Sequence, residues 1–189
     1  TPAGAKPGYH LVCVKSLGLE TLINFSLTKR RLAAELFGRE TALSLAQKVR
    51  MQTCVNEALI LAETGGVSAM HDATEGGFVA ALNEIADASN VGFTVDFAEL
   101  PMLPELRTLA KHFGLSWQQV LATSSTGTLL AAVSPSHREK VMQALSRLQF
   151  SGKVVGVFVE EKRRRIRLDG KEVNFPKVAA DPYAEILGR

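Results

Sequence analysis

Cysteine and aromatic residues are scarce in this sequence. Its 189 residues include two cysteines, Cys13 and Cys54, whose wide separation gives neither a disulfide framework nor a metal-binding spacing. Because Cys13 lies within the apolar run Leu11–Val14, we expect a small buried thiol there; a catalytic thiol is the alternative, and no neighbouring feature supports it. Aromatic residues make up 6% of the chain, so aliphatic side chains must provide most of the core.

Long hydrophobic runs and a strong excess of one charge are also absent. No stretch approaches the roughly 18 apolar residues that a transmembrane helix requires, and residues 1–8 lack the pattern of a signal peptide. We therefore expect no membrane partner and a cytoplasmic location. The formal net charge of +3 suits an anionic small molecule but does not by itself indicate nucleic acid.

Length and composition are those of one globular domain. A chain of 189 residues with 46% hydrophobic and 22% charged residues can bury a substantial core. Residues 1–9 are rich in proline and glycine and show no periodicity, so we interpret them as a truncated interdomain linker. The domain itself is expected over residues 10–189.

Hydrophobic periodicity predicts strands and helices in mixed order. Strands are expected at residues 10–15, 67–71, 91–97, 128–133, 154–159 and 165–168. Helices are expected at residues 20–37, 40–63, 76–88, 106–113 and 141–148, with a break in the second near residues 51–55. Ser116 and Asp181 are typical N-caps of two further short helices. This order favours an α+β fold with a mixed or antiparallel sheet and helices packed on one face.

The segment Met70–Phe78 carries the clearest indication of chemistry. Thr74 is a favourable N-cap, which would leave Glu75, Gly76 and Gly77 as a first helical turn with free amides and partial positive charge. Glycines let a ligand approach the backbone closely. We therefore expect this turn to bind a phosphate; the alternative is a capped helix start without a ligand, because one glycine-rich turn is weak evidence.

Acidic residues and a histidine flank the same turn. Asp72 and Glu75 could hold a Mg²⁺ ion that accompanies a phosphate, or a substrate amine. We take Asp72 and His71 as the candidate catalytic residues. The alternative for His71 is an ordinary histidine at a strand end, since no second histidine or cysteine lies at metal-ligand spacing.

The stretch from His71 to Ala86, HDATEGGFVAALNEIA, resembles the signature of a known C-terminal domain. It is shared by aminoimidazole ribonucleotide (AIR) synthetase, formylglycinamidine ribonucleotide synthetase, selenophosphate synthetase, thiamine-monophosphate kinase and the carbamoyl-dehydrating hydrogenase maturation factor. Further similarity follows in the family's order at residues 15–20, 91–93, 100–101 and 115–130, so that the resemblance covers residues 8–159. The Met-His-Asp-Ala-Thr-Glu-Gly-Gly and Leu-Gly-Leu-Glu segments are most similar to the hydrogenase maturation factors.

The resemblance implies an ATP-dependent enzyme that activates an amide-type or related oxygen by phosphoryl transfer. In such enzymes ATP and Mg²⁺ are held mainly by an N-terminal domain, usually across a homodimer, and the C-terminal domain closes over the phosphates and substrate. Here that closing face would include Asp72, Thr74, Gly76 and Gly77. The loop with Ser124, Ser125 and Gly127 is a second candidate for phosphate or substrate binding, with a simple polar turn as the alternative.

The N-terminal glycine-rich and aspartate-bearing motifs of this superfamily are absent from the sequence. We therefore expect the isolated chain not to turn over ATP. The implied substrate is a small molecule or a protein thiocarboxamide. Residues 183–189 lack the cysteine that carbamoyl dehydratases carry at the C-terminus, which is a departure from their pattern.

Three other functions remain open from the sequence. The fold could serve as a non-catalytic interaction or dimerisation module, or as part of a purine-biosynthesis-type amidine ligase. Nucleic-acid binding through residues 162–165 and Arg167 is the third. We expect no nucleic-acid partner, because the basic cluster has no interleaved aromatic residues and is typical of a solvated strand edge.

Overall fold

The computed structural model describes residues 1–188 and contains a seven-stranded sheet in the order β2-β4-β1-β5-β3-β6-β7. The strands are β1 (His10–Val14), β2 (Val67–Asp72), β3 (Gly92–Asp96), β4 (Leu129–Val133), β5 (Gly152–Val159), β6 (Arg164–Leu168) and β7 (Lys171–Asn174). Neighbouring strands run antiparallel except β3 and β6, which are parallel. The sheet is therefore mixed, as the sequence predicted.

Nine α-helices lie within the described residues. They are α1 (Leu19–Thr28), α2 (Arg30–Phe37), α3 (Arg39–Ala46), α4 (Val55–Thr64), α5 (Gly77–Ser89), α6 (Pro104–Phe113), α7 (Trp117–Ala122), α8 (Arg138–Arg147) and α9 (Tyr183–Leu187). Short 3₁₀ turns span Gln47–Met51, Phe97–Glu99 and Pro135–His137. No helix of residues 1–188 is both long and apolar enough to cross a membrane.

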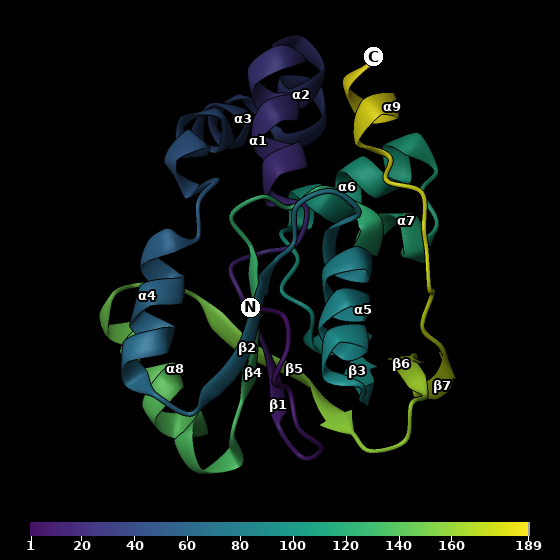
Figure 1. Ribbon diagram of the computed structural model, residues 1–189. Helices are drawn as coiled ribbons and strands as arrows, with labels where there is room; N and C mark the ends of the chain where they lie inside the picture. The colour runs from purple at the N-terminus through teal and green to yellow at the C-terminus, as the bar shows by residue number, and fades with distance from the viewer. Residues whose placement is uncertain (189) are drawn as a thin grey trace.

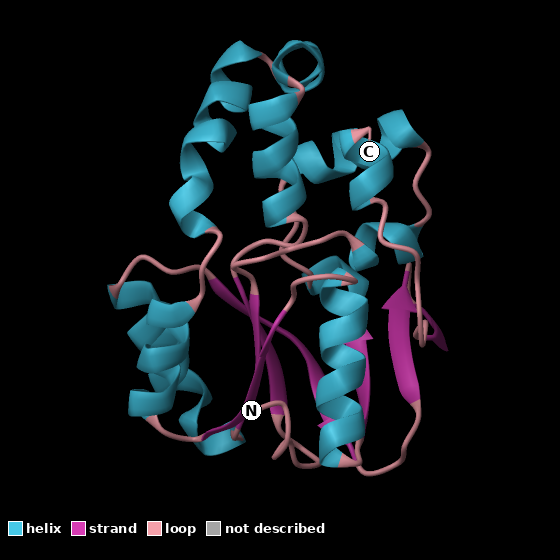
Figure 2. Ribbon diagram, turned by 45° about the horizontal axis from the view of Figure 1, so that its top comes forward, coloured by secondary structure: helices cyan, strands magenta, loops and turns pink. Residues whose placement is uncertain are grey.

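The α+β class is confirmed, and the sheet carries helices on both of its faces (Figures 1 and 2). One face packs against α5, with Leu11 and Cys13 of β1 in the same cluster as Phe78 and Leu82. The alternate residues of β1 pack with α4 and α8 in a second cluster. The expectation of helices on one face was therefore wrong. Strands that are buried on both faces have continuous apolar sequences, and β1 and β4 show this pattern.

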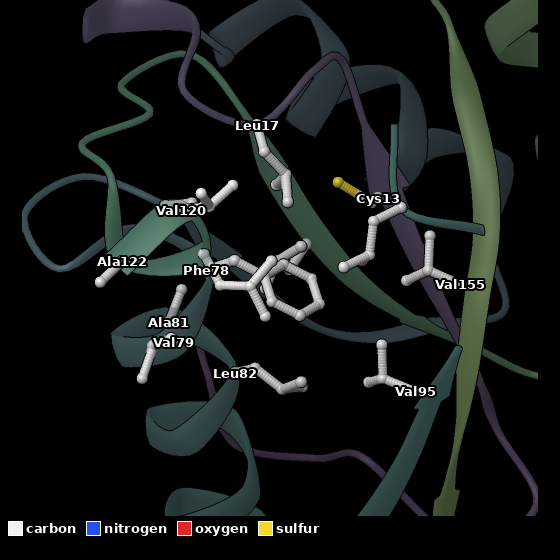
Figure 3. Close-up of a cluster of buried hydrophobic side chains, with 14 of the residues drawn as sticks. Cys13, Leu17, Phe78, Val79, Ala81, Leu82, Val95, Val120, Ala122 and Val155 are labelled. Carbon is white, nitrogen blue, oxygen red and sulfur yellow. The ribbon is translucent and has the colours of Figure 1, made fainter. Parts of the chain in front are cut away.

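The main core lies between α5 and the sheet (Figure 3). Cys13 is fully buried there, which confirms the expected buried thiol, and burial raises its pKa far above the usual range. Phe175 packs edge-on against Phe93, with ring centroids 5.0 Å apart, and against Phe78 at 6.1 Å. These contacts anchor the segment that leads to the C-terminus onto the core.

Two of the expected helices are interrupted. The helix expected at residues 20–37 breaks at Lys29, whose backbone is non-helical (φ −109°, ψ 43°). The break expected near residues 51–55 is confirmed by the 3₁₀ turn that precedes α4. Lys15 explains this second break, because its buried Nζ donates to the carbonyls of Met51 and Thr53 at 3.2 and 2.6 Å and so holds the connection against β1.

Residues 1–9 lie against the sheet edge and α5. The carbonyl of Thr1 accepts a hydrogen bond from the Met70 amide at 2.9 Å, and Ala5 is buried. The amides of Gly4 and Ala5 both donate to the Ser89 hydroxyl. Their interpretation as an interdomain linker stays a prediction.

Candidate functional site

The turn between β2 and α5 differs from the one expected. Gly76, not Thr74, is the N-cap, and α5 begins at Gly77. Both glycines have positive φ, 72° and 53°, which glycine adopts at little cost. A Cβ on Gly77 would lie 2.5 Å from the carbonyl oxygen of Thr123, so this turn packs directly against the end of α7. The prediction of Thr74 as N-cap was therefore wrong, because the two glycines place the start of α5 further along the chain.

Asp181 binds the amide of this turn from the C-terminal segment. Its carboxylate accepts hydrogen bonds from the Gly76 amide at 3.2 Å, the Ser124 amide at 3.3 Å and the Ser124 hydroxyl at 2.5 Å. A fourth bond comes from the Tyr183 amide at 2.9 Å. The expectation that Asp181 is the N-cap of α9 was wrong, because Pro182 occupies that position. An internal carboxylate thus lies where the sequence predicted an external anion.

The loop of residues 124–127 meets the β2–α5 turn and the start of α1, so three segments of the resemblance converge. The Ser125 amide donates to the Ala73 carbonyl at 3.0 Å, and the Ser125 hydroxyl accepts from the Gly18 amide at 2.6 Å. The Thr126 amide and hydroxyl donate to the Glu20 carboxylate. The two segments predicted to bind phosphate or substrate are therefore neighbours.

Within this loop Ser124 and Thr126 donate to carboxylates, those of Asp181 and Glu20, whereas Ser125 and Gly127 do not. The Ser125 side chain is buried, and its hydroxyl also donates to the carbonyl of Thr123. Gly127 has φ 97°, and a Cβ there would lie 2.1 Å from the carbonyl oxygen of Met51. The geometry of Ser125 and Gly127 therefore fits a packed turn, which was the alternative reading for both.

His71 and Asp72 lie at the end of β2 beside α5. His71 Nδ1 is 3.3 Å from Asp72 Oδ1, and its Nε2 contacts the carboxylate of Glu84. The Asp72 side chain is 48% exposed, so it can reach a ligand, whereas His71 is mostly covered. A histidine whose two ring nitrogens each face a carboxylate is held in one orientation, and an oriented imidazole is suited to proton transfer.

The Cys54 thiol near this group is not activated. Burial raises its pKa, and the negative charge of Asp72 raises it further; Lys15 lowers it by a smaller amount. Nucleophilic cysteines need the opposite shift. Cys54 is therefore expected to stay protonated near neutral pH.

The residues proposed for Mg²⁺ form an incomplete set. Within residues 1–188 there is no group of three or more histidine, cysteine, aspartate or glutamate side chains arranged to hold a metal. Glu75 is exposed and joins neither of the hydrogen-bonded groups described above. Mg²⁺ commonly uses one or two protein carboxylates together with phosphate oxygens, so the half-exposed Asp72 remains compatible with such a role.

The family model for the C-terminal domain of AIR synthase related proteins matches residues 6–169. The chain belongs to this family. Carbamoyl dehydratase HypE of Escherichia coli is 34% identical over 131 residues, which are 68% of this chain and 37% of that protein. The PurL subunit of phosphoribosylformylglycinamidine synthase from Thermoanaerobacter is 32% identical over 136 residues, 72% of this chain and 16% of that protein.

Solved structures agree with this AIR synthase related fold. The crystal structure of E. coli HypE superposes with a TM-score of 0.73 at 25% identity and covers 98% of this chain. A HypE structure in complex with ATP superposes at 0.72 with 18% identity and supports the fold alone. The chain spans 55% of the E. coli HypE chain, about half of its length.

Several residues of this AIR synthase related site were not found from the sequence. Glu20 lies within a segment of the resemblance, but nothing marked it as a partner of the loop. Glu84 faces His71 from α5, and a carboxylate 13 positions after a histidine gives no recognisable spacing. Asp181 lies 57 positions beyond Ser124, so only the fold could show their contact.

The basic cluster of this AIR synthase related domain is largely paired. Arg164 binds Asp87, Arg167 lies 3.4 Å from Asp96, and Arg165 lies 3.5 Å from Glu172. These arginines lie on β6, which is flanked by β3 and β7, so the expectation of a strand edge was wrong. Much of the positive charge in the sequence cluster is therefore balanced by neighbouring acidic side chains.

Proposed function

We propose that this chain is the phosphate- and substrate-contacting part of an ATP-dependent enzyme that activates an amide-type oxygen by phosphoryl transfer. The N-terminal ATP-binding half would lie outside this chain, either in a longer protein or in a partner. Membership of the AIR synthase related family supports the proposal, as do the carbamoyl dehydratases among the relatives. The observation that carries it is the set of donors around Asp181.

These donors suit an oxyanion of a phosphoryl group. The Gly76 amide lies at the start of α5, where the helix dipole favours negative charge. The amide and hydroxyl of Ser124 approach the same carboxylate from a second element. A phosphoryl oxygen needs the same donors as a carboxylate oxygen, so it would replace Asp181 when the C-terminal segment moves away.

Metal binding and proton transfer would fall to Asp72, His71 and Glu84. The exposed carboxylate of Asp72 could hold a Mg²⁺ ion on the phosphates, and bound Mg²⁺ would neutralise charge that develops during transfer. His71, oriented by Glu84, would accept or return a proton of the substrate. The chain would thus contribute positioning and electrostatic stabilisation, not a covalent nucleophile.

The finer assignments rest on the relatives. A role in hydrogenase maturation with a protein thiocarboxamide substrate follows the HypE relatives, and a structure of a HypE–HypF complex shows that such a protein assembles with a partner. An amidine ligase step of purine biosynthesis follows the PurL relative. A homodimer across which ATP binds, and a cytoplasmic location, belong to the same proposal.

The first measurement is the intact mass of this protein in its source cell. A mass well above 20.4 kDa would show that the ATP-binding half lies in the same chain, and assays should then use that longer protein. A mass of 20.4 kDa would direct the search to a separate partner that supplies it.

The site itself is tested by titrating tripolyphosphate into the purified chain and recording amide NMR spectra. We expect the amides of Gly76 and Ser124 to shift. Asp181→Asn should strengthen this binding, because the competing charge is removed, and Ser124→Ala should weaken it. Shifts confined to the paired arginines of β6, unchanged by either substitution, would refute the phosphate site.

A further inference from the structure

A pocket of about 560 Å³ lies among α1, α2 and α3, apart from the site described above. Figures 1 and 2 show these three helices as a group beyond one end of the sheet. None of the pocket's residues belongs to the β2–α5 turn or to the loop of residues 124–127. Its volume is typical of sites for small organic molecules, which range over about 300–1,000 Å³.

The walls of the pocket are mainly apolar. Small side chains on facing helices, Ala34 of α2 with Ala42 and Ala46 of α3, leave the space open. Leu27 and Leu43 complete the apolar lining, and Leu43 is 55% exposed. Pockets for small molecules are lined predominantly by apolar side chains, as this one is.

A buried hydroxyl without a partner lines the same pocket. Ser26 of α1 is 2% exposed, and its Oγ forms no hydrogen bond with any atom of residues 1–188. Buried polar groups in proteins are nearly always satisfied, so each exception requires an explanation. The Oγ itself has almost no exposed surface, so a ligand oxygen would satisfy this hydroxyl after a shift of the side chains that cover it.

Positive charge surrounds the opening. Arg30, Arg31 and Arg39 all line the pocket. Arg31 forms an ion pair with Glu35, and the Nε of Arg30 donates a hydrogen bond to the Leu27 carbonyl at 3.2 Å. Arg39 forms no ion pair or side-chain hydrogen bond within the described part of the chain, so its guanidinium is available for a bidentate contact with a carboxylate.

We propose that this pocket binds a small organic carboxylate with an apolar body. The body would pack against the alanines and Leu43, the carboxylate would face Arg39 and Arg30, and one oxygen would accept from Ser26. This binding site is separate from the phosphate site, and its existence does not depend on the proposed function.

The test uses naphthoate and its neutral isostere naphthamide, titrated into the purified chain by calorimetry. We expect one saturable site for naphthoate and affinity for naphthamide lower by about tenfold, as the loss of a charged hydrogen-bonded pair predicts. Arg39→Gln should lower naphthoate affinity by a similar factor. Arg147→Gln on α8 is the matched control and should leave it unchanged.

A second pair of variants tests the apolar wall. Leu43→Glu should abolish naphthoate binding, whereas Leu148→Glu should not, although Leu148 is exposed to a similar extent at 52%. Both substitutions are at exposed positions and should leave the melting temperature nearly unchanged. Ser26→Ala should reduce affinity while keeping or raising stability, because it removes an unpaired buried group.

Three results would overturn the proposal. The first is the absence of saturable naphthoate binding at millimolar concentration. The second is equal loss of binding in the Arg39 and Arg147 variants. The third is concentration-dependent dimerisation in sedimentation experiments that Leu43→Glu abolishes, because a second copy of the chain would then occupy the pocket.

Discussion

The buried pair of Lys15 and Glu57 provides the most quantitative prediction. Lys15 Nζ lies 2.6 Å from Glu57 Oε1, and the two side chains are only 5% and 3% exposed. The ammonium also donates to the carbonyls of Met51 and Thr53, so all its partners are in the connection before α4 or in α4 itself. Glu57→Ala would leave this charge buried without its counter-ion.

The expected cost follows from desolvation. Removing one partner of a buried ion pair destabilises a protein by about 3–5 kcal/mol. Alanine is the best helix former, so the substitution itself adds no penalty within α4. For a domain of this size, each kcal/mol lowers the melting temperature by about 2–4 °C, which gives a loss of about 6–20 °C.

Lys153 and Glu99 form the matched control. Their charged atoms are 2.9 Å apart, but the side chains are 45% and 51% exposed, so Glu99→Ala should cost less than about 1 kcal/mol. Urea unfolding followed by circular dichroism would measure both variants. The double replacement of Lys15→Met with Glu57→Leu should recover much of the loss, since well-packed apolar pairs can replace buried ion pairs. Equal destabilisation by Glu57→Ala and Glu99→Ala would refute the reasoning.

The remaining predictions concern the turn, the thiols and the reaction. Gly77→Ala should cost about 3 kcal/mol or more in chemical unfolding, because a Cβ would lie 2.5 Å from a carbonyl oxygen. Gly114→Ala, with φ 63° and open space around it, should cost about 1–2 kcal/mol from the backbone alone; equal losses would contradict the packing argument. Cys13 and Cys54 should react slowly with a disulfide reagent at neutral pH, because burial raises the pKa of both thiols. The labelling rate should rise with pH as the thiolate forms. Fast labelling of the native protein at neutral pH would contradict this prediction. The purified chain should show no ATP turnover, and a robust ATPase rate that Gly76→Asp abolishes would disprove this.

Much of the fold could be predicted from the sequence where a local signal was strong. The apolar runs of β1 and β4 and the periodic helix α5 lie close to their expected places. Ser116 forms the expected cap, and its own amide donates in return to the Gln119 side chain. The break at Lys29 could not be predicted, because residues on both sides of it favour a helix. Helix formation there is overridden by packing between α1, α2 and α3.

The candidate site could be predicted only in part, for a similar reason. The signature containing His71 and Gly76 is contiguous, so the sequence located it. Glu84 lies within the signature, but its contact with His71 follows only from how α5 packs beside β2. Asp181 comes from the C-terminal segment, far outside the signature. The N-cap was misplaced because Thr74 is a good capping residue locally, whereas the contact between Gly77 and α7 decides where the helix begins.

The position of β1 in the sheet has a consequence for how the protein acquires its structure during synthesis. This strand begins at His10, yet its two neighbours, β4 and β5, begin at Leu129 and Gly152. Because β1 is synthesised before both of these neighbours, its edges stay unpaired until β4 and β5 have been made, and pairing over such separations is slow. Nascent chains that end before residue 129 should thus expose the apolar β1 to chaperones, while α5 can already form locally.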